Sequence, residues 1–295
     1  MELKENLKGV YTILITPFKD NYDLDLQGLN SNINHCIECG VHGVVVGGSL
    51  GEFSSLTMEE RRLIIKEAIK ATAGRVPLVA CTAHSCLKDA IELTEYAKEE
   101  GADGVMMTAP YFCHPSEEGI LNFFKEVNDA VDIDIVLYNT FRAGVNLTPE
   151  FISQLADIPH IVGIKQGSRN MNELINSVGF ASDRLAVMAG NEEMMLGCYS
   201  LGMVGTTGVT SGFLPNIFLD VYHATQRNQY DEARNSFYKL WEYFRIVAEV
   251  GQPAVAKETM RLMGLAAGPM RLPMVARNQA KLKELKGVLN NLGML

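Results

Sequence analysis

The sequence predicts an α/β fold, a (β/α)8 TIM barrel with a C-terminal helical extension. Short apolar runs rich in valine and isoleucine occur eight times, and segments with helical spacing of apolar residues separate them. This alternation is typical of a parallel sheet with crossover helices. The length of 295 residues also suits one such barrel.

The expected strands are short and nearly all apolar, as strands buried on both faces should be. In chain order they are Val10–Thr16, Gly43–Val46, Pro77–Cys81, Gly104–Met107, Ile135–Tyr138, Ile161–Lys165, Leu185–Ala189 and Gly205–Val209.

Capping residues mark the expected helix starts. Thr57 with Glu60 forms a capping box, Ser116 precedes apolar residues at helical spacing, and Thr148 precedes a first-turn proline. After Pro215 only helical segments follow: Phe218–Gln226, Tyr230–Val250, Ala254–Met263 and Asn278–Leu292. We therefore expect residues 1–215 to form the barrel core. Residues 216–295 would add the last barrel helix and a helical extension within the same structural unit.

Composition excludes several functions. The net charge is −9 without a basic stripe, which argues against nucleic-acid binding. We find no signal peptide, and no apolar run approaches the roughly 20 residues of a membrane helix. With six cysteines and no secretory signal, we expect a cytoplasmic protein that binds no membrane.

One cysteine pair raises the question of a metal. Cys36 and Cys39 form a C-x-x-C pair, with His35 and His42 nearby. A structural zinc site needs four ligands at defined spacing, and no second cysteine pair follows. We interpret the pair as free thiols on a helix and expect neither a metal site nor a cofactor.

The candidate chemistry lies where the expected strands end, because barrels of this type carry their active sites there. Lys165 ends an apolar strand, and Tyr138 ends the neighbouring one. Desolvation disfavours an ammonium and produces a nucleophilic amine, and a nearby phenol can move protons. The alternatives are a lysine that reaches solvent from a strand end and a structural tyrosine at the rim.

A glycine-rich turn, Gly47–Gly51, follows the second expected strand. Its backbone amides and the Ser49 hydroxyl could hold a carboxylate. A dinucleotide site is disfavoured, because the spacing is not G-x-G-x-x-G. The remaining alternative is a tight loop without a ligand.

These segments together make the chain similar to the family of dihydrodipicolinate synthase and N-acetylneuraminate lyase over nearly its whole length. The matching segments are Gly9–Phe18, Gly47–Glu52, Tyr138-Asn139, Gly163–Lys165, Gly205–Thr210, Gln252-Pro253 with Lys257, Met263-Gly264 and Arg271–Pro273.

The resemblance implies a class I lyase that is a homotetramer, built as a pair of tight dimers. Lys165 would attack the ketone of pyruvate or a similar 2-oxo acid, Tyr138 would shuttle protons, and Gly48 with Ser49 would hold the carboxylate. The imine acts as the electron sink, so no metal is required. We assign Lys165, Tyr138 and Ser49 as catalytic residues. The substrate-binding candidates are Gly48, Ser49, Leu50, Phe112, Arg142, Asn191 and Thr207.

Three departures from the synthase pattern accompany the resemblance. Leu50 stands where synthases have a second threonine, and Phe112 stands where they have a tyrosine that reaches a neighbouring subunit's site. The loop after Tyr138 is one residue shorter than usual, which places Arg142 one step early. A displaced guanidinium fork grips a carboxylate poorly.

Three functions therefore remain open. The first is a Schiff-base lyase (an aldolase, a dehydratase or a deaminating hydrolase) acting on another 2-oxo acid, and the departures favour it. The second is the synthase that condenses pyruvate with aspartate semialdehyde. The third is a ligand-binding barrel without turnover, because a fold does not guarantee a function.

Overall fold

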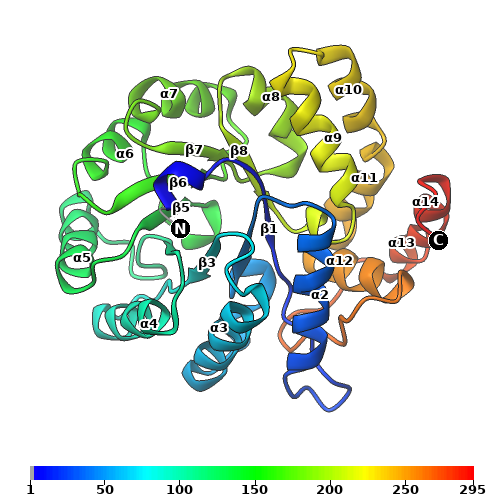
Figure 1. Ribbon diagram of the computed structural model, residues 1–295, viewed down its shortest axis with the longest axis horizontal. Coiled ribbons are helices and arrows are strands. Elements are labelled where there is room, and N and C mark those ends of the chain that lie inside the picture. Colours follow the sequence, from blue (N-terminus) through cyan, green and yellow to red (C-terminus); the bar gives the residue numbers. More distant parts are fainter. Residues whose placement is uncertain (1–2) are drawn as a thin grey trace.

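The computed structural model describes residues 3–295, and its centre is a closed barrel of eight parallel strands in sequential order (Figure 1). The strands are β1 Gly9–Ile13, β2 Gly43–Val46, β3 Leu78–Cys81, β4 Gly104–Met107, β5 Ile135–Asn139, β6 Ile161–Gln166, β7 Ala186–Ala189 and β8 Gly205–Gly208. This confirms the predicted (β/α)8 barrel.

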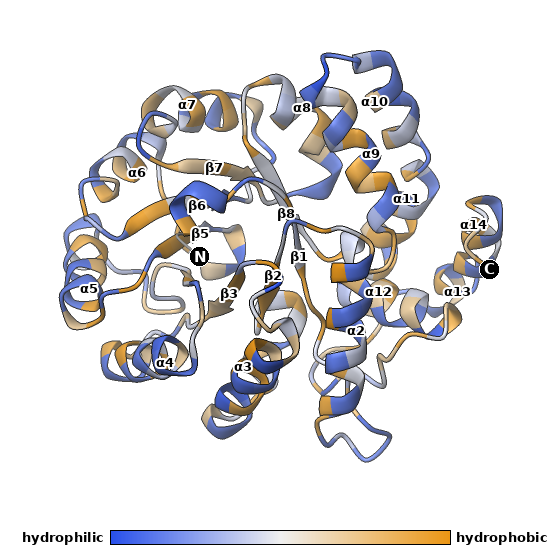
Figure 2. Cartoon of the chain, in the orientation of Figure 1, coloured by the Kyte–Doolittle hydropathy of each residue, from blue (hydrophilic) through white to orange (hydrophobic). Residues whose placement is uncertain are grey.

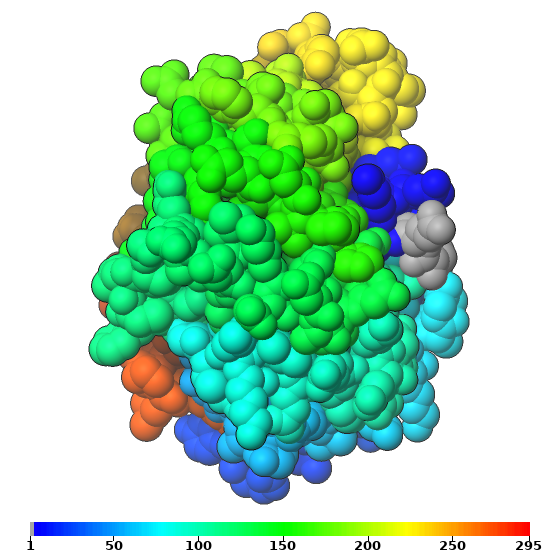
Figure 3. Space-filling model, turned by 90° about the vertical axis from the view of Figure 1, so that its left-hand side faces the viewer, coloured from blue at the N-terminus to red at the C-terminus, as the bar shows by residue number. Residues whose placement is uncertain are grey.

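Helices surround the barrel. Those up to the last barrel helix are α1 Leu3–Asn6, α2 Leu26–Glu38, α3 Met58–Thr72, α4 Leu87–Glu100, α5 Glu117–Ala130, α6 Pro149–Leu155, α7 Met171–Ala181, α8 Met195–Ser200 and α9 Pro215–Gln226. Figure 3 shows the side of the molecule on which the green and cyan segments of the chain pack against one another.

The C-terminal extension follows the barrel as helices α10 Tyr230–Tyr238, α11 Trp241–Val250, α12 Gln252–Leu262, α13 Gln279–Leu282 and α14 Leu285–Asn291. Two predicted helices are each divided in the structure. The segment Tyr230–Val250 breaks at Lys239 and Leu240, and Asn278–Leu292 breaks before Leu285.

The first strand differs most from its predicted bounds. It ends at Ile13, whereas the sequence pattern extended it to Thr16. Leu14 still donates one backbone hydrogen bond to Val45, at 2.9 Å. The Thr16 hydroxyl then donates to the Gly51 carbonyl at 2.6 Å. These residues stay buried and apolar like a strand, although they form a loop that supports the turn after β2.

The strands alternate their side chains between two apolar layers. Val44 and Val46 of β2 belong to the layer packed against the outer helices, and Val45 belongs to the layer that continues into α9, α11 and α12. Figure 2 shows orange, hydrophobic strands inside and bands of blue on the helices around them. In residues 3–295, no helix has the length and apolar character needed to cross a membrane.

The extension is attached to the barrel at the end where β1 and β2 finish. Gly268 has a φ of +69°, and a Cβ at this position would lie 1.7 Å from the Phe18 carbonyl oxygen. Only glycine permits so close an approach. This contact packs a residue of the extension directly against the segment that follows β1.

Candidate active site

Lys165 and Tyr138 are direct partners across the parallel pair β5–β6. The Lys165 Nζ lies 4.0 Å from the centroid of the Tyr138 ring. Both side chains are buried, and only 3% of Lys165 is exposed. An amine with an apolar stem and an aromatic face beside it is held at one point, with few water molecules to compete for it.

The Tyr138 hydroxyl has its own set of neighbours. Burial raises the pKa of this phenol, but the charge of Lys165, hydrogen bonds with Thr140 and Ser49, and the charge of Arg142 outweigh burial and lower it overall. A phenol with a lowered pKa gives up and regains its proton more readily near neutral pH. The Ser49 and Thr140 hydroxyls therefore form a short polar path around Tyr138.

The turn after β2 brings Ser49 to this place. Gly47 has a positive φ of 69°, and residues Ser49–Gly51 form a 3-10 turn that begins after Gly48. Leu50 is buried on the same turn. Glu52 closes the turn in the left-handed region, with a φ of 55°.

A small cavity of about 100 Å³ opens above Lys165 and Tyr138. It adjoins a larger cavity of about 680 Å³, and Ser49, Thr140 and Arg142 line both. Two further arginines, Arg169 and Arg277, also line the larger cavity. Arg169 lies 3.6 Å from Glu193, which also lines both cavities, whereas within residues 3–295 Arg142 and Arg277 have no carboxylate at ion-pair distance. These two arginines favour an anionic ligand locally, although the whole chain has a net charge of −9.

Most of the residues predicted for the site come together around the small cavity. Its walls include Lys165, Tyr138, Ser49, Leu50, Arg142, Asn191 and Thr207. Gly48 is not among the lining residues but directly precedes Ser49. Arg142 remains at the cavity despite the shortened loop.

Two of these residues also have structural partners. The Asn191 side-chain oxygen accepts a hydrogen bond from the Glu193 backbone at 3.2 Å, and it thereby caps the turn after β7. The Thr207 hydroxyl points to the Met188 sulfur at 3.7 Å. Both residues still line the small cavity.

Phe112 lies elsewhere. Its side chain is 92% exposed, its φ is +74°, and it lines neither cavity. The preceding residue, Tyr111, lines the larger cavity instead. The directions of the Tyr111 and Phe112 side chains do not follow strand alternation, because both residues lie in the loop beyond the end of β4.

Sequence reasoning missed Glu192 and Gln252. Glu192 is buried in the cavity wall, and its carboxylate accepts hydrogen bonds from the Thr210 amide at 2.7 Å and the Thr210 hydroxyl at 2.6 Å. Gln252, at the start of α12, donates to the same carboxylate at 2.8 Å. Burial raises the pKa of Glu192, although these hydrogen bonds and Lys165 oppose the rise.

The extension supports the glycine turn through a buried ion pair. The Lys257 Nζ lies 2.6 Å from Glu52 Oε1 and donates to the Pro269 carbonyl at 2.7 Å. Arg271 donates its backbone N–H to the other Glu52 oxygen at 3.0 Å. The Arg271 guanidinium also grips Glu60 with two hydrogen bonds of 2.7 and 2.6 Å. Helices α3 and α12 are thus both tied to the turn that carries Ser49.

The residues of the cysteine pair do not converge on one point. Cys36 is buried and donates its thiol to the Gly212 carbonyl, and burial raises the pKa of this thiol to about 12. Cys39 faces His35 at 3.9 Å, and the His42 ring accepts the Val10 N–H instead. Cys36 and Cys39 therefore have separate partners and form no disulfide.

A closed (β/α)8 barrel with a buried lysine at the carboxyl ends of its strands is the framework of a class I aldolase-type lyase. The family comparison specifies the class further. The model of the dihydrodipicolinate synthetase family matches residues 6–292, and the chain belongs to this family.

Relatives and solved structures agree with this assignment. A 4-hydroxy-tetrahydrodipicolinate synthase from Methanospirillum hungatei is 35% identical, over 96% of this chain and 98% of the relative. One from Methanocaldococcus jannaschii is 33% identical, over 98% and 99%. A crystal structure of a dihydrodipicolinate synthase has a TM-score of 0.93 at 33% identity, covering 98% of this chain and 100% of that one. A prophage protein of the family from E. coli K12, solved with pyruvate, has a TM-score of 0.93 at 27% identity, covering 98% and 99%.

Proposed function

We propose that this lyase forms a Schiff base between Lys165 and pyruvate or a closely related 2-oxo acid. The observation that carries the proposal is the position of the Lys165 amine, buried at the floor of the small cavity and 4.0 Å from the Tyr138 ring centroid. The cavity volume of about 100 Å³ suits a three-carbon acid. Its position at the carboxyl ends of the strands is where barrel enzymes carry their chemistry.

The proposed reaction begins when the Lys165 amine attacks the ketone carbon. Tyr138 passes a proton to the resulting hydroxyl, which leaves as water while the imine forms. The protonated imine withdraws electrons, so that a proton or a carbon–carbon bond at the adjacent carbon breaks more easily. Ser49, which helps to lower the pKa of Tyr138, is the proposed second member of the proton path.

The substrate carboxylate has donors close by. We propose that the Gly48–Ser49 segment supplies backbone N–H groups and one hydroxyl, as preorganised donors do at anion sites. Asn191 and Thr207 would contact the substrate from the opposite wall. Leu50 makes the side of the cavity beside Ser49 apolar.

We further propose that turnover requires no added metal or cofactor, because the imine itself stabilises the carbanion. Activity should be unchanged after dialysis against a chelator. Loss of activity on chelation, together with recovery on adding a divalent ion, would refute this part of the proposal.

The second candidate is the synthase reaction itself. The relatives from Methanospirillum hungatei and Methanocaldococcus jannaschii carry that name, and Arg142 lines both cavities, where it could bind the distal carboxylate of an aldehyde substrate. Leu50 and the exposed Phe112 argue against it, since each lacks a hydroxyl present in synthases. A coupled assay of pyruvate-dependent condensation separates the two candidates.

For the assembly we propose a homotetramer in the cytoplasm. A nearly fully exposed Phe112 with a left-handed backbone is costly for an isolated chain and is explained by a partner that covers it. Met171 and Ile175, one turn apart on α7, are a second exposed apolar pair, 42% and 46% exposed. The six cysteines are all free, as is usual in a reducing compartment. Light scattering on purified protein tests the tetramer.

Borohydride trapping tests the central proposal. The purified chain is incubated with individual 2-oxo acids, reduced and digested, and the modified lysine is identified by mass spectrometry. Lys257 provides an internal control, because it is also buried but is already paired with Glu52. We expect the modification on Lys165. Its absence with every 2-oxo acid, or its appearance on Lys257 alone, contradicts the mechanism.

A further inference from the structure

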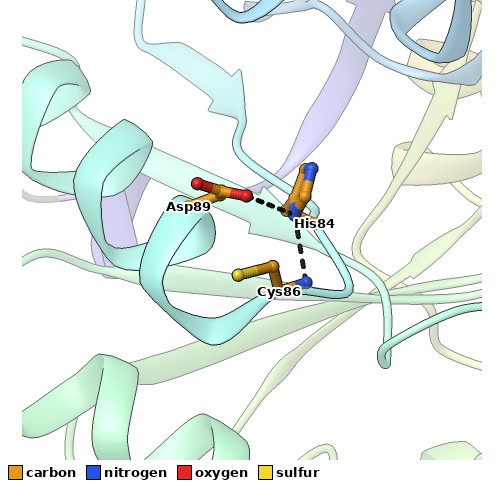
Figure 4. A group of neighbouring side chains, drawn as sticks. All are labelled: His84, Cys86 and Asp89. Carbon is orange, nitrogen blue, oxygen red and sulfur yellow. Dashed lines mark hydrogen bonds and ion pairs between the residues drawn. The ribbon is translucent and has the colours of Figure 1, made fainter.

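Three potential metal ligands lie together outside the candidate active site. His84 and Cys86 belong to the loop after β3, and Asp89 lies on the first turn of α4 (Figure 4). None of the three lines either cavity of the candidate site. We propose that they bind a divalent cation of the zinc type.

The spacing of the ligand atoms fits such an ion. One ligand atom from each side chain lies within 4.8 Å of the other two. His84 Nδ1 and Asp89 Oδ2 are 3.5 Å apart. Zinc bonds of about 2.0–2.2 Å at a tetrahedral angle place two ligand atoms about 3.4 Å apart. The thiolate of an exposed cysteine needs only a side-chain rotation to complete the set.

The hydrogen bonding of His84 supplies a second argument. The Cys86 backbone N–H donates to His84 Nδ1 at 3.0 Å, so this nitrogen points its lone pair towards the start of α4. Asp89 Oδ2 lies 3.5 Å from the same nitrogen. A cation bound between these two atoms would take the Nδ1 lone pair in place of the Cys86 N–H.

The other two ligands are available. Within residues 3–295, neither the Cys86 thiol nor the Asp89 carboxylate takes part in a hydrogen bond. Cys86 occupies the N-cap position of α4 but makes no side-chain capping bond, whereas Thr57 caps α3 with a complete capping box. The Cys86 side chain is therefore not committed to capping the helix.

The ligand types select the ion. One imidazole, one thiolate and one carboxylate favour zinc or cobalt over magnesium or calcium, which prefer oxygen alone. Three protein ligands leave a fourth position for water.

The site would also fix a loop that reaches the larger cavity. Ser85 lies between two of the ligands, and its hydroxyl donates to the Tyr111 carbonyl at 2.7 Å and accepts from the Tyr111 amide at 3.0 Å. Tyr111 is a wall residue of that cavity. The bound ion would hold the residues on both sides of Ser85, and thereby this connection.

Cobalt titration of the metal-stripped full-length chain tests the site directly. We expect one equivalent to produce the visible bands of tetrahedral cobalt together with a thiolate charge-transfer band, and zinc to remove both. Cys86→Ser should abolish the charge-transfer band. His84→Ala and Asp89→Asn should each weaken zinc binding at least ~10-fold. Cys113→Ser, which removes another exposed cysteine, is the matched control and should change nothing.

Alkylation of the wild-type chain gives a second measurement that needs no variant. Zinc should slow modification of Cys86 by iodoacetamide and leave Cys113 unprotected. The proposal is overturned if no thiolate band develops with excess cobalt, if the band survives in Cys86→Ser, or if zinc fails to protect Cys86. No turnover is measured, so the result is independent of the proposed function.

Discussion

The Lys257 Nζ lies 2.6 Å from Glu52 Oε1, and only 5% of the Lys257 side chain and 2% of the Glu52 side chain are exposed. Glu52 ends the turn that carries Ser49, and Lys257 comes from α12 of the extension. The pair thus joins the C-terminal helices to a residue of the proposed proton path.

Breaking this pair should destabilise the protein strongly. Lys257→Met leaves the Glu52 carboxylate buried without its partner, which typically costs about 3–5 kcal/mol. Chemical denaturation measures the change in the free energy of unfolding. The double variant Glu52→Gln, Lys257→Met is the control and should recover much of the loss, because no buried charge remains. A double variant as unstable as the single one would show that the ion pair is not the cause.

Lys165→Ala should abolish both turnover and borohydride trapping while the chain stays folded. The Lys165 amine borders an open cavity and is not part of the apolar packing, so its loss leaves the barrel intact. Circular dichroism and thermal unfolding check the fold. Substantial activity in the folded variant would disprove the Schiff-base mechanism.

The pH dependence of kcat/KM should change when a neighbour of Tyr138 is substituted. Thr140→Val removes a hydrogen bond that favours the ionised phenol, so the pKa of Tyr138 should rise towards its ordinary value. If the ionised phenol acts as the base, the rise of kcat/KM with increasing pH should move to higher pH in this variant.

Tyr138→Phe is the reference for this experiment. This substitution should lower the rate by roughly a hundredfold, the usual scale for a lost acid–base group. It should also remove the rise of kcat/KM with increasing pH. An unchanged pH profile in Thr140→Val, or an unchanged rate in Tyr138→Phe, would take the corresponding residue out of the proton path.

Synthase activity should be poor. Leu50 and Phe112 lack two hydroxyls of the synthase pattern, and polar partners of a missing hydroxyl are left unpaired. We expect condensation of pyruvate with aspartate semialdehyde to be at least ~100-fold less efficient than in a working synthase, or about 2.7 kcal/mol of transition-state stabilisation. Leu50→Thr with Phe112→Tyr should restore part of it. A wild-type efficiency near ~10⁵ M⁻¹s⁻¹ would establish the synthase reaction instead.

The sequence could predict the barrel because its signals are local. Each buried strand is a short apolar run, and the end of a strand fixes where a side chain such as Lys165 emerges. The register of β5 and β6 then brings Tyr138 beside it, as the order of a parallel barrel requires.

The contacts with the extension could not be predicted in the same way. Glu192 and Gln252 are 60 positions apart, and no periodicity links an α12 amide to a carboxylate that follows β7. Phe112 shows the other limit. The direction of its side chain depends on a left-handed backbone in the loop after β4, two residues beyond Pro110, and neither local alternation nor composition specifies that conformation.

The walls of the small cavity come from two parts of the chain, the barrel strands and the C-terminal helices. The amine and the phenol come from adjacent strands, whereas Phe244, Val247 and Gln252 enter from helices α11 and α12. Substitutions in these helices can change the shape of the cavity without moving the Lys165 amine or the Tyr138 phenol. The same barrel can therefore accept different substrates through substitutions in its C-terminal helices, while the strands keep the residues of the reaction in place.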